Sequence, residues 1–187
     1  MKKLILIAGL FMAILPNAKA QEKFGNTLNL GLGLGYYGYA PFNTIALHAN
    51  YEFDVAKDFT LAPFITYSSY RRDYYWGNNN YPYRYYSYRQ TVVPIGVKGT
   101  YYFDDAFNAG SKWDFYGAAS LGFAIVRSRW EDGYPGDKNV YRYRSFYGGT
   151  TPLYLDLHLG AEYHFNSKIG MFLDLSTGIT TLGVAIH

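Results

Sequence analysis

The sequence predicts an all-β fold, an eight-stranded antiparallel up-and-down transmembrane β-barrel. Eight short segments alternate large apolar residues with small or polar ones, and this period of two places successive side chains on opposite faces of a strand. A leader of the export type precedes all eight. The composition combines 20 Gly with 20% aromatic residues, 22 of them Tyr, which suits a barrel with small residues inside and aromatic belts at two membrane interfaces.

The leader predicts export from the cytoplasm. Lys2 and Lys3 precede an apolar run over 4–15, and Ala18-Lys19-Ala20 has the small-x-small pattern of a cleavage site. The apolar run is too short to span about 30 Å of hydrocarbon as a helix, so a membrane anchor is disfavoured. We therefore expect residues 1–20 to be a cleaved signal peptide and residues 21–187 to be the barrel domain. The sequence has no cysteine, so neither a lipid-attachment site nor disulfides are expected.

The charge balance argues against a nucleic-acid partner. The formal net charge of the whole sequence is +3, and three lysines leave with the leader, which contains no acidic residue. The mature chain is therefore formally neutral and lacks the excess of basic residues that binding to nucleic acid requires.

The first four predicted strands are 27–37, 43–53, 59–68 and 91–103. Their apolar faces carry, in order, Leu28, Leu30, Leu32 and Leu34; Ile45, Leu47, Ala49, Tyr51 and Phe53; Phe59, Leu61, Pro63, Ile65 and Tyr67; and Val93, Ile95, Val97, Tyr101 and Phe103. Proline lacks the N–H that a ladder hydrogen bond needs. We therefore expect Pro63 and Pro94 at bulges or near strand ends.

The last four predicted strands are 113–126, 153–165, 169–176 and 181–187. Their apolar faces carry Trp113, Phe115, Leu121, Phe123 and Ile125; the odd-numbered residues from Leu153 to Phe165; Met171, Leu173 and Leu175; and Leu182, Val184 and Ile186. The total is even, and most segments approach the roughly 9–11 residues that a tilted strand needs to cross a bilayer.

The links between the strands alternate in length. Those at 54–58 and 166–168 are tight and the one at 104–112 is modest, whereas those at about 69–90 and 127–151 are long. Transmembrane barrels have short periplasmic turns and longer external loops. We therefore expect the long links to lie outside the cell and both chain ends to lie in the periplasm.

The bulk of the apolar face indicates that it points outward. An eight-stranded barrel is only just wide enough inside for its own side chains, and this set of Leu, Ile, Phe, Tyr and Trp would overpack it. Aromatic residues also gather at strand ends, as two interfacial girdles require, whereas a general preference of aromatic residues for strands would predict no such clustering. The apolar face is therefore predicted to meet lipid.

Three segments carry a resemblance to a known family. Leu61-Ala62-Pro63, the run from Pro94 to Phe103 and the run from Leu159 to Tyr163 resemble small eight-stranded outer-membrane β-barrels of the OmpA, OmpX and OmpW types. The nearest pattern is the "outer membrane protein beta-barrel" group of Bacteroidetes-like bacteria. The resemblance implies a bacterial outer-membrane location, contact with outer-membrane lipid and the barrel-assembly machinery, and a monomer. One departure is the end Ala185-Ile186-His187, because such barrels usually end in an aromatic residue that the assembly machinery recognises.

Ionisable residues fall on the predicted inner face, where an isolated charge would be costly. We expect them to pair in a network that fills the lumen. The candidates are His48, Glu52, Lys98, Asp114, Asp156, His158, Glu162 and Asp174. His158 and Glu162 lie about 13 Å apart along one strand at 3.3 Å per residue, too far to bind one ion. The sequence therefore predicts no metal site and no catalytic site.

No cofactor is predicted either. The glycines of 33–38 match G-x-G-x-x-G, but a dinucleotide site needs a helix directly after them, whereas here they lie within an alternating strand.

The two long links are rich in Tyr and Arg, which dominate binding hot spots and stack on sugar faces. The candidate binding residues are Tyr70, Arg71, Arg72, Tyr74, Tyr75, Trp76, Tyr83, Arg84, Tyr85, Arg142, Tyr143 and Arg144. The arginines could also pair with lipopolysaccharide phosphates. Alternatively, the strands extend beyond the membrane as a Tyr-rich hairpin without a binding role.

The predicted function is therefore that of a non-enzymatic integral outer-membrane protein, structural or surface-binding, whose external ligand the sequence does not name. The alternative is a small pore or transporter, porin-like, for small or hydrophobic solutes.

Overall fold

A computed structural model describes residues 26–35, 44–103, 112–131, 133, 135 and 153–187. These residues form eight strands. The strands are β1 (Thr27–Gly35), β2 (Thr44–Ala56), β3 (Phe59–Asn78), β4 (Tyr81–Tyr102), β5 (Trp113–Trp130), β6 (Leu153–His164), β7 (Ile169–Ser176) and β8 (Ile179–Ile186). In the described part of the chain, no helix is both long enough and apolar enough to cross a membrane.

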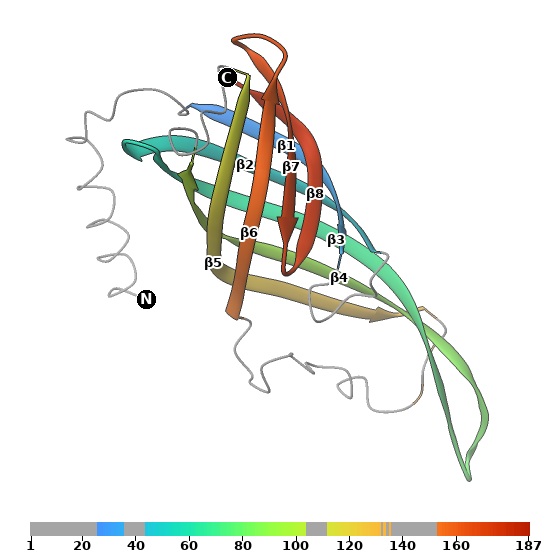
Figure 1. The fold of residues 1–187 in the computed structure, drawn as a ribbon. Coiled ribbons are helices and arrows are strands. Elements are labelled where there is room, and N and C mark those ends of the chain that lie inside the picture. The colour runs from blue at the N-terminus through green and yellow to red at the C-terminus, as the bar shows by residue number, and fades with distance from the viewer. Residues whose placement is uncertain (1–25, 36–43, 104–111, 132, 134, 136–152) are drawn as a thin grey trace, which may run out of the picture.

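The strands form a closed barrel in chain order, with every neighbouring pair antiparallel (Figure 1). The first and last strands close it, with Leu28 opposite Ile186 and Gly35 opposite Ile179. Closure leaves no sheet edge whose N–H and C=O groups would lack partners in hydrocarbon. The predicted fold class, an eight-stranded antiparallel up-and-down transmembrane barrel, is confirmed.

The barrel is apolar outside and polar inside. Leu32, Leu157 and Leu159 on the outer face are 58–63% exposed, whereas inward Thr60 and Thr100 are completely buried. All the outward positions predicted for β6 to β8 that carry Leu, Met, Val or Ile are exposed. This distribution of apolar and polar side chains is the reverse of that in a soluble domain and is typical of a barrel whose outer wall contacts lipid.

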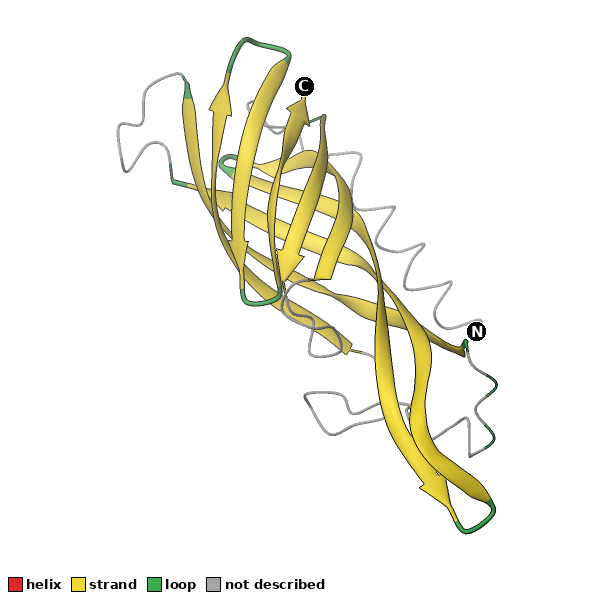
Figure 2. Ribbon diagram, turned by 90° about the vertical axis from the view of Figure 1, so that its right-hand side faces the viewer, coloured by secondary structure: helices red, strands yellow, loops and turns green. Residues whose placement is uncertain are grey.

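Strands β3 and β4 are the longest of the eight described strands. They contain 20 and 22 residues, and their ends project beyond the barrel as a two-stranded hairpin (Figures 1 and 2). Of the two alternatives predicted for 69–90, the structure has the Tyr-rich hairpin that extends the strands and not an irregular loop, because pairing continues from Ser69 opposite Thr91 to Trp76 opposite Arg84. Alternating Tyr and Trp have a high preference for strands, and paired rings stabilise the ladder.

Asparagine side chains shape two of the turns. At the hairpin tip, Asn78 Oδ1 accepts hydrogen bonds from the backbone N–H groups of Asn80 (2.9 Å) and Tyr81 (3.0 Å). Asn166 Oδ1 accepts the N–H groups of Lys168 and Ile169 in the same way between β6 and β7. Such side-chain acceptors stand in for backbone carbonyls and favour tight reversals.

The two strand prolines do not lie at bulges or strand ends, and that prediction is wrong. Pro63 and Pro94 lie well inside β3 and β4, opposite Val97 and Ala124. Each interrupts only the ladder on its other side: the β2–β3 pairing skips from Asn50–Phe64 to Phe53–Leu61 without a change of register. The β3–β4 pairing likewise skips two positions beside Pro94. A missing N–H therefore removes local pairing but not the strand, because the other neighbour still holds it.

Candidate functional site

The centre of the lumen is occupied by a three-residue ion cluster. Lys98 Nζ of β4 lies 3.5 Å from Glu52 Oε1 of β2 and 3.4 Å from Asp174 Oδ2 of β7. The three side chains are only 3–6% exposed. Since β7 is not a neighbour of β2 or β4 in the sheet, Lys98 joins separate walls of the barrel across its interior.

Tyrosine hydroxyls also donate hydrogen bonds to these carboxylates. Tyr102 donates to Glu52 Oε2 at 2.7 Å, and Tyr116 donates to Asp174 Oδ2 at 3.2 Å. The Tyr116 ring packs against Gly160, where a larger residue would not fit, because its Cβ would lie 2.2 Å from the ring. Sequence reasoning did not include these tyrosines, although their even positions place them on the inward face.

His158 extends the network to a further wall. Its Nδ1 lies 2.7 Å from Asp174 Oδ1 and its Nε2 lies 2.8 Å from Ser120 Oγ. His48 contacts Thr66 and Asn50 and does not reach the ion cluster directly. The lumen at this level is therefore filled by side chains that hydrogen-bond one another. Buried charges are stable only when they are paired and hydrogen-bonded in this way.

Asp156 has a different role from the central ions. Its two oxygens accept hydrogen bonds from Ser176 Oγ (2.9 Å), Thr177 Oγ1 (2.5 Å) and the backbone N–H of Gly178 (2.8 Å). Tyr154 donates to the same carboxylate at 2.8 Å. Asp156 thus fastens the tight β7–β8 turn to β6.

The remaining two predicted lumen residues, Asp114 and Glu162, lie at the barrel end that carries the C-terminus. Asp114 Oδ2 lies 2.7 Å from His164 Nε2, and Glu162 Oε1 lies 2.8 Å from His187 Nε2. The hydrogen bond to Glu162 raises the pKa of His187 above its ordinary value. Among the described residues, the inward ionisable groups thus form two sets. The central network reaches Asp156 through His158, whose Nε2 lies 3.8 Å from Asp156 Oδ2, and a second cluster lies at the C-terminal end of the barrel.

The hairpin has an inner face of packed rings that continues the lumen side of the barrel. Trp130 of β5 lies 5.2 Å from Tyr88 and 6.3 Å from Tyr74, measured between ring centroids. Tyr70 and Tyr86 are buried on the same face, 8% and 1% exposed. The rings of Tyr70, Tyr86 and Tyr88 therefore form a packed layer that presents little free surface.

The candidate arginines are mostly engaged on the hairpin itself. Arg72 and Arg84 lie over the rings of Tyr70 and Tyr86 at 5.6 and 4.6 Å from the centroids. Arg71 makes an ion pair with Glu131 at 3.1 Å, and Glu131 also pairs with Arg89.

The outer face of the hairpin carries three exposed tyrosines. Tyr75, Tyr83 and Tyr85, here called the tip tyrosines, are 55%, 65% and 69% exposed. The Tyr75 ring lies 5.0 Å from that of Tyr85 and 5.7 Å from that of Tyr83. These candidates form one aromatic surface, while Trp76 packs on the opposite face against Tyr81 and Tyr86. Arg142, Tyr143 and Arg144 lie outside the described residues.

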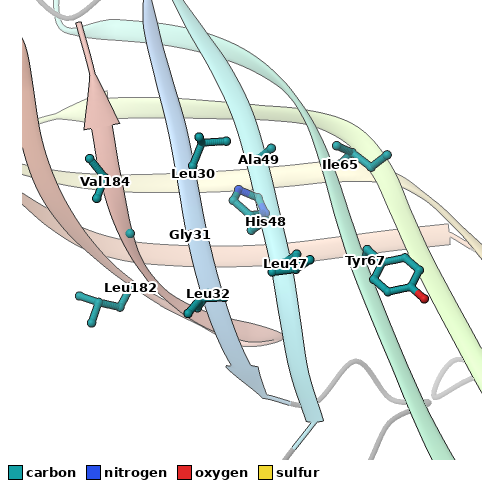
Figure 3. Close-up of a pocket in the computed structure, with 11 residues that line it drawn as sticks. Leu30, Gly31, Leu32, Leu47, His48, Ala49, Ile65, Tyr67, Leu182 and Val184 are labelled. Carbon is teal, nitrogen blue, oxygen red and sulfur yellow. The ribbon is translucent and has the colours of Figure 1, made fainter.

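A cavity of about 580 Å³ lies on the outer wall across β8, β1, β2 and β3 (Figure 3). Its rim is formed by outward side chains, including Leu32, Leu47, Ile65 and Leu182. Most of its lining is apolar, with His48 and Tyr67 as the polar side chains, so it belongs to the apolar belt and offers few of the polar groups that orient a specific ligand.

Aromatic residues also form a girdle at the C-terminal end of the barrel. Trp113 stacks near Phe115 and lies 4.9 Å from Tyr163, which contacts Phe165, while Tyr101 contacts Phe103.

Comparisons with known proteins return similar folds. No protein-family model and no curated protein matches the sequence. Among solved structures, a de novo designed transmembrane β-barrel has 11% identity and a TM-score of 0.47, over 89% of this chain and 98% of that one. Ail, the attachment invasion locus protein of Yersinia pestis, in complex with the heparin analogue sucrose octasulfate, has 9% identity and a TM-score of 0.42, over 87% and 99%. At such identities the similarity concerns the fold alone.

Proposed function

We propose that the chain is a non-enzymatic integral protein of the bacterial outer membrane that binds an external ligand through its β3–β4 hairpin. The observation that carries the proposal is the surface of tip tyrosines held on a paired, projecting hairpin. In this proposal the barrel serves as the anchor and the leader delivers the chain to the periplasm.

The outer wall supports a membrane location. Exposed leucines, isoleucines and valines occupy the outer positions of all the described strands within the barrel, and this surface would aggregate in water. The C-terminus and the hairpin lie at opposite ends of the barrel (Figure 1). A periplasmic C-terminus therefore places the hairpin outside the cell.

The filled lumen favours a binding protein over a pore. Lys98, Glu52 and Asp174 meet across the interior and are almost fully buried. A conducting path would have to separate these ions or displace them. Purified protein in a planar bilayer is therefore expected to show no steady conductance, and steady channel openings would instead support the pore.

The tip tyrosines define the chemistry of the ligand. Tyrosine offers a large apolar ring and a hydroxyl at low conformational cost. Three adjacent rings on one face suit stacking against sugar rings, and we propose a cell-surface or matrix glycan as the ligand class.

The test compares cells that display the natural protein with cells that display Tyr75→Ser/Tyr83→Ser/Tyr85→Ser on glycan and matrix-protein arrays. Tyr81→Ser is the matched control, because Tyr81 is also exposed but packs on the opposite face against Trp76. The triple variant is expected to lose at least about tenfold in binding, equivalent to 1.4 kcal/mol, while the control keeps it. Equal binding by the triple variant, or no binding by the natural protein, would refute the proposal.

A further inference from the structure

Two histidines and a glutamate converge at the C-terminal end of the barrel. Glu162 and His164 stand on β6, and His187 directly follows β8. His187 Nε2 lies 2.8 Å from Glu162 Oε1, and His164 Nδ1 lies 3.8 Å from the same oxygen. One nitrogen from each ring and one carboxylate oxygen all lie within 4.8 Å of one another. Ligands of a tetrahedral zinc ion at about 2.0–2.1 Å lie somewhat over 3 Å apart, so small side-chain movements suffice.

The second ring nitrogen of each histidine is held by a partner outside the cluster. Asp114 Oδ2 lies 2.7 Å from His164 Nε2, and Thr27 Oγ1 lies 2.8 Å from His187 Nδ1. Metal-binding histidines nearly always have such a contact, which fixes the ring orientation and the tautomer. Here both contacts leave the nitrogen that faces Glu162 as the one to bind an ion.

The surroundings of Glu162 keep its carboxylate in place. A Cβ at Gly170 of the adjacent strand β7 would lie 2.3 Å from Glu162 Oε1, so glycine at this position makes room for the carboxylate. Glu162 is 6% exposed as a side chain, whereas His164 and His187 are 20% and 19% exposed. An ion could therefore reach the cluster from the barrel mouth.

The charge of the cluster also suits a dication. Asp114 and Glu162 bring two carboxylates together, and no lysine or arginine among the described residues pairs with either of them. The described salt bridges of these carboxylates involve histidines only. A divalent ion would balance both charges.

We propose that Glu162, His164 and His187 bind one divalent transition-metal ion, with Zn²⁺ as the expected ion, at the periplasmic mouth of the barrel. Two imidazoles and one carboxylate are a favoured ligand set for Zn²⁺, and a fourth position stays open to solvent or to a further ligand. Asp114 and Thr27 are positioning residues that orient the two rings. The site is separate from the hairpin and independent of the function proposed for it.

The test uses full-length protein purified without a histidine tag, folded in detergent, treated with a chelator and dialysed. Calorimetric titration with Zn²⁺ is expected to show one ion per chain with a Kd at or below about 1 μM. Co²⁺ in the same site should give the intense visible absorption of a four-coordinate ion, which an octahedral surface site would not give.

The variants His164→Gln, His187→Gln and Glu162→Gln should each weaken binding by more than about 100-fold, and Asp114→Asn by about 10- to 100-fold. Gly170→Ala should also weaken it by displacing the Glu162 carboxylate. His48→Gln is the matched control, since His48 contacts Thr66 and Asn50 in the lumen, and it should bind as the natural protein does.

His187 lies outside the eight strands, directly after β8, so His187→Gln keeps the test decisive if Glu162→Gln does not fold. Folding of each variant is checked by its faster gel migration before boiling. The absence of saturable Zn²⁺ and Co²⁺ binding, or tight binding that survives either histidine substitution, would overturn the proposal.

Discussion

Strands β3 and β4 run through two regions that use the same alternation differently. Inside the barrel, outward Ile65 is 50% exposed and inward Thr66 is 1% exposed, so the pattern separates lipid from lumen. In the hairpin both faces carry tyrosines: Tyr86 is buried on one face, and Tyr85 is 69% exposed on the other. The period of two is a property of every strand. What each face contacts, whether lipid, lumen or water, depends on whether that part of the strand belongs to the barrel or to the hairpin.

The two regions also differ in what stabilises them. Barrel strands pair on both sides and surround a hydrogen-bonded interior. A two-stranded ribbon is marginal alone in water and depends on cross-strand ring pairs worth about 0.2–1 kcal/mol each. Substitutions should therefore be costly in the barrel and mild in the hairpin.

The largest effect is expected for Lys98→Met. This change leaves Glu52 and Asp174 buried without their shared cation, and breaking a buried ion cluster costs about 3–5 kcal/mol. Urea-induced unfolding in lipid vesicles measures the loss. Adding Asp174→Asn should restore part of it, and a loss below about 1 kcal/mol would show that the lumen ions do not act as a unit.

Leu157→Arg tests the outer wall. Leu157 is 58% exposed on the face assigned to lipid, so an arginine there should lower the free energy of unfolding by about 2–4 kcal/mol if it lies near the bilayer midplane. The matched change Tyr85→Arg on the hairpin should alter it by no more than about 0.5 kcal/mol, as is usual for a surface position. Similar values for the two variants would contradict the assignment of faces.

Asp156→Asn should have an intermediate and localised effect. Asparagine keeps the shape but loses the charge that strengthens the bonds from Ser176, Thr177 and Gly178, so we expect a loss of about 1–3 kcal/mol. Hydrogen exchange at the Gly178 amide should accelerate more than exchange in β2. Uniform acceleration along the chain would argue against a local role at the β7–β8 turn.

The smallest effect is expected when residues 70–90 are replaced by Asn-Gly. Ser69 and Thr91 already pair, and Asn-Gly forms the two-residue turn that such a pair favours. The free energy of unfolding should change by only about 1 kcal/mol, because the change removes just the β4–β5 pairs at Tyr88, Arg89 and Gln90 and leaves the rest of the barrel ladder paired. Loss of the heat-modifiable gel shift in this variant would show that the hairpin is part of the folding unit.

The topology of the hairpin can be examined separately with an epitope tag at Asn79. Antibody should bind the tag on intact cells. A tag that becomes visible only after lysis would invert the proposed orientation and remove the hairpin as an external binding surface.

Strand positions and faces were predictable because alternation is local. Which inward residues meet was not predictable, because that depends on strand tilt and closure. His158 and Glu162 lie on the same strand but belong to different clusters, whereas Glu162 and His187, 25 residues apart, lie 2.8 Å from each other. The contacts of Lys98, Asp156 and Glu162 could be recognised only once the strands were placed around a common interior.

The hairpin could be predicted from the sequence only as one of two alternatives for 69–90. With tyrosine on both faces, 69–90 lacks the contrast between apolar and polar positions that marks the barrel strands, and its Asn-rich turn resembles an ordinary loop. The register, with Tyr74 opposite Tyr86 and Tyr75 opposite Tyr85, decides between a loop and a hairpin.

The continuity of β3 and β4 from tip to barrel has a mechanical consequence. A pull on the tip along the hairpin puts both strands under tension together and leaves the bonds between them largely unstrained. The force passes to the β2–β3 and β4–β5 ladders, whose long registers resist it in shear, with many hydrogen bonds sharing the tension. A load applied at the tip would thus reach the barrel wall along the strand direction, in which a β-ladder breaks only when many of its bonds fail together.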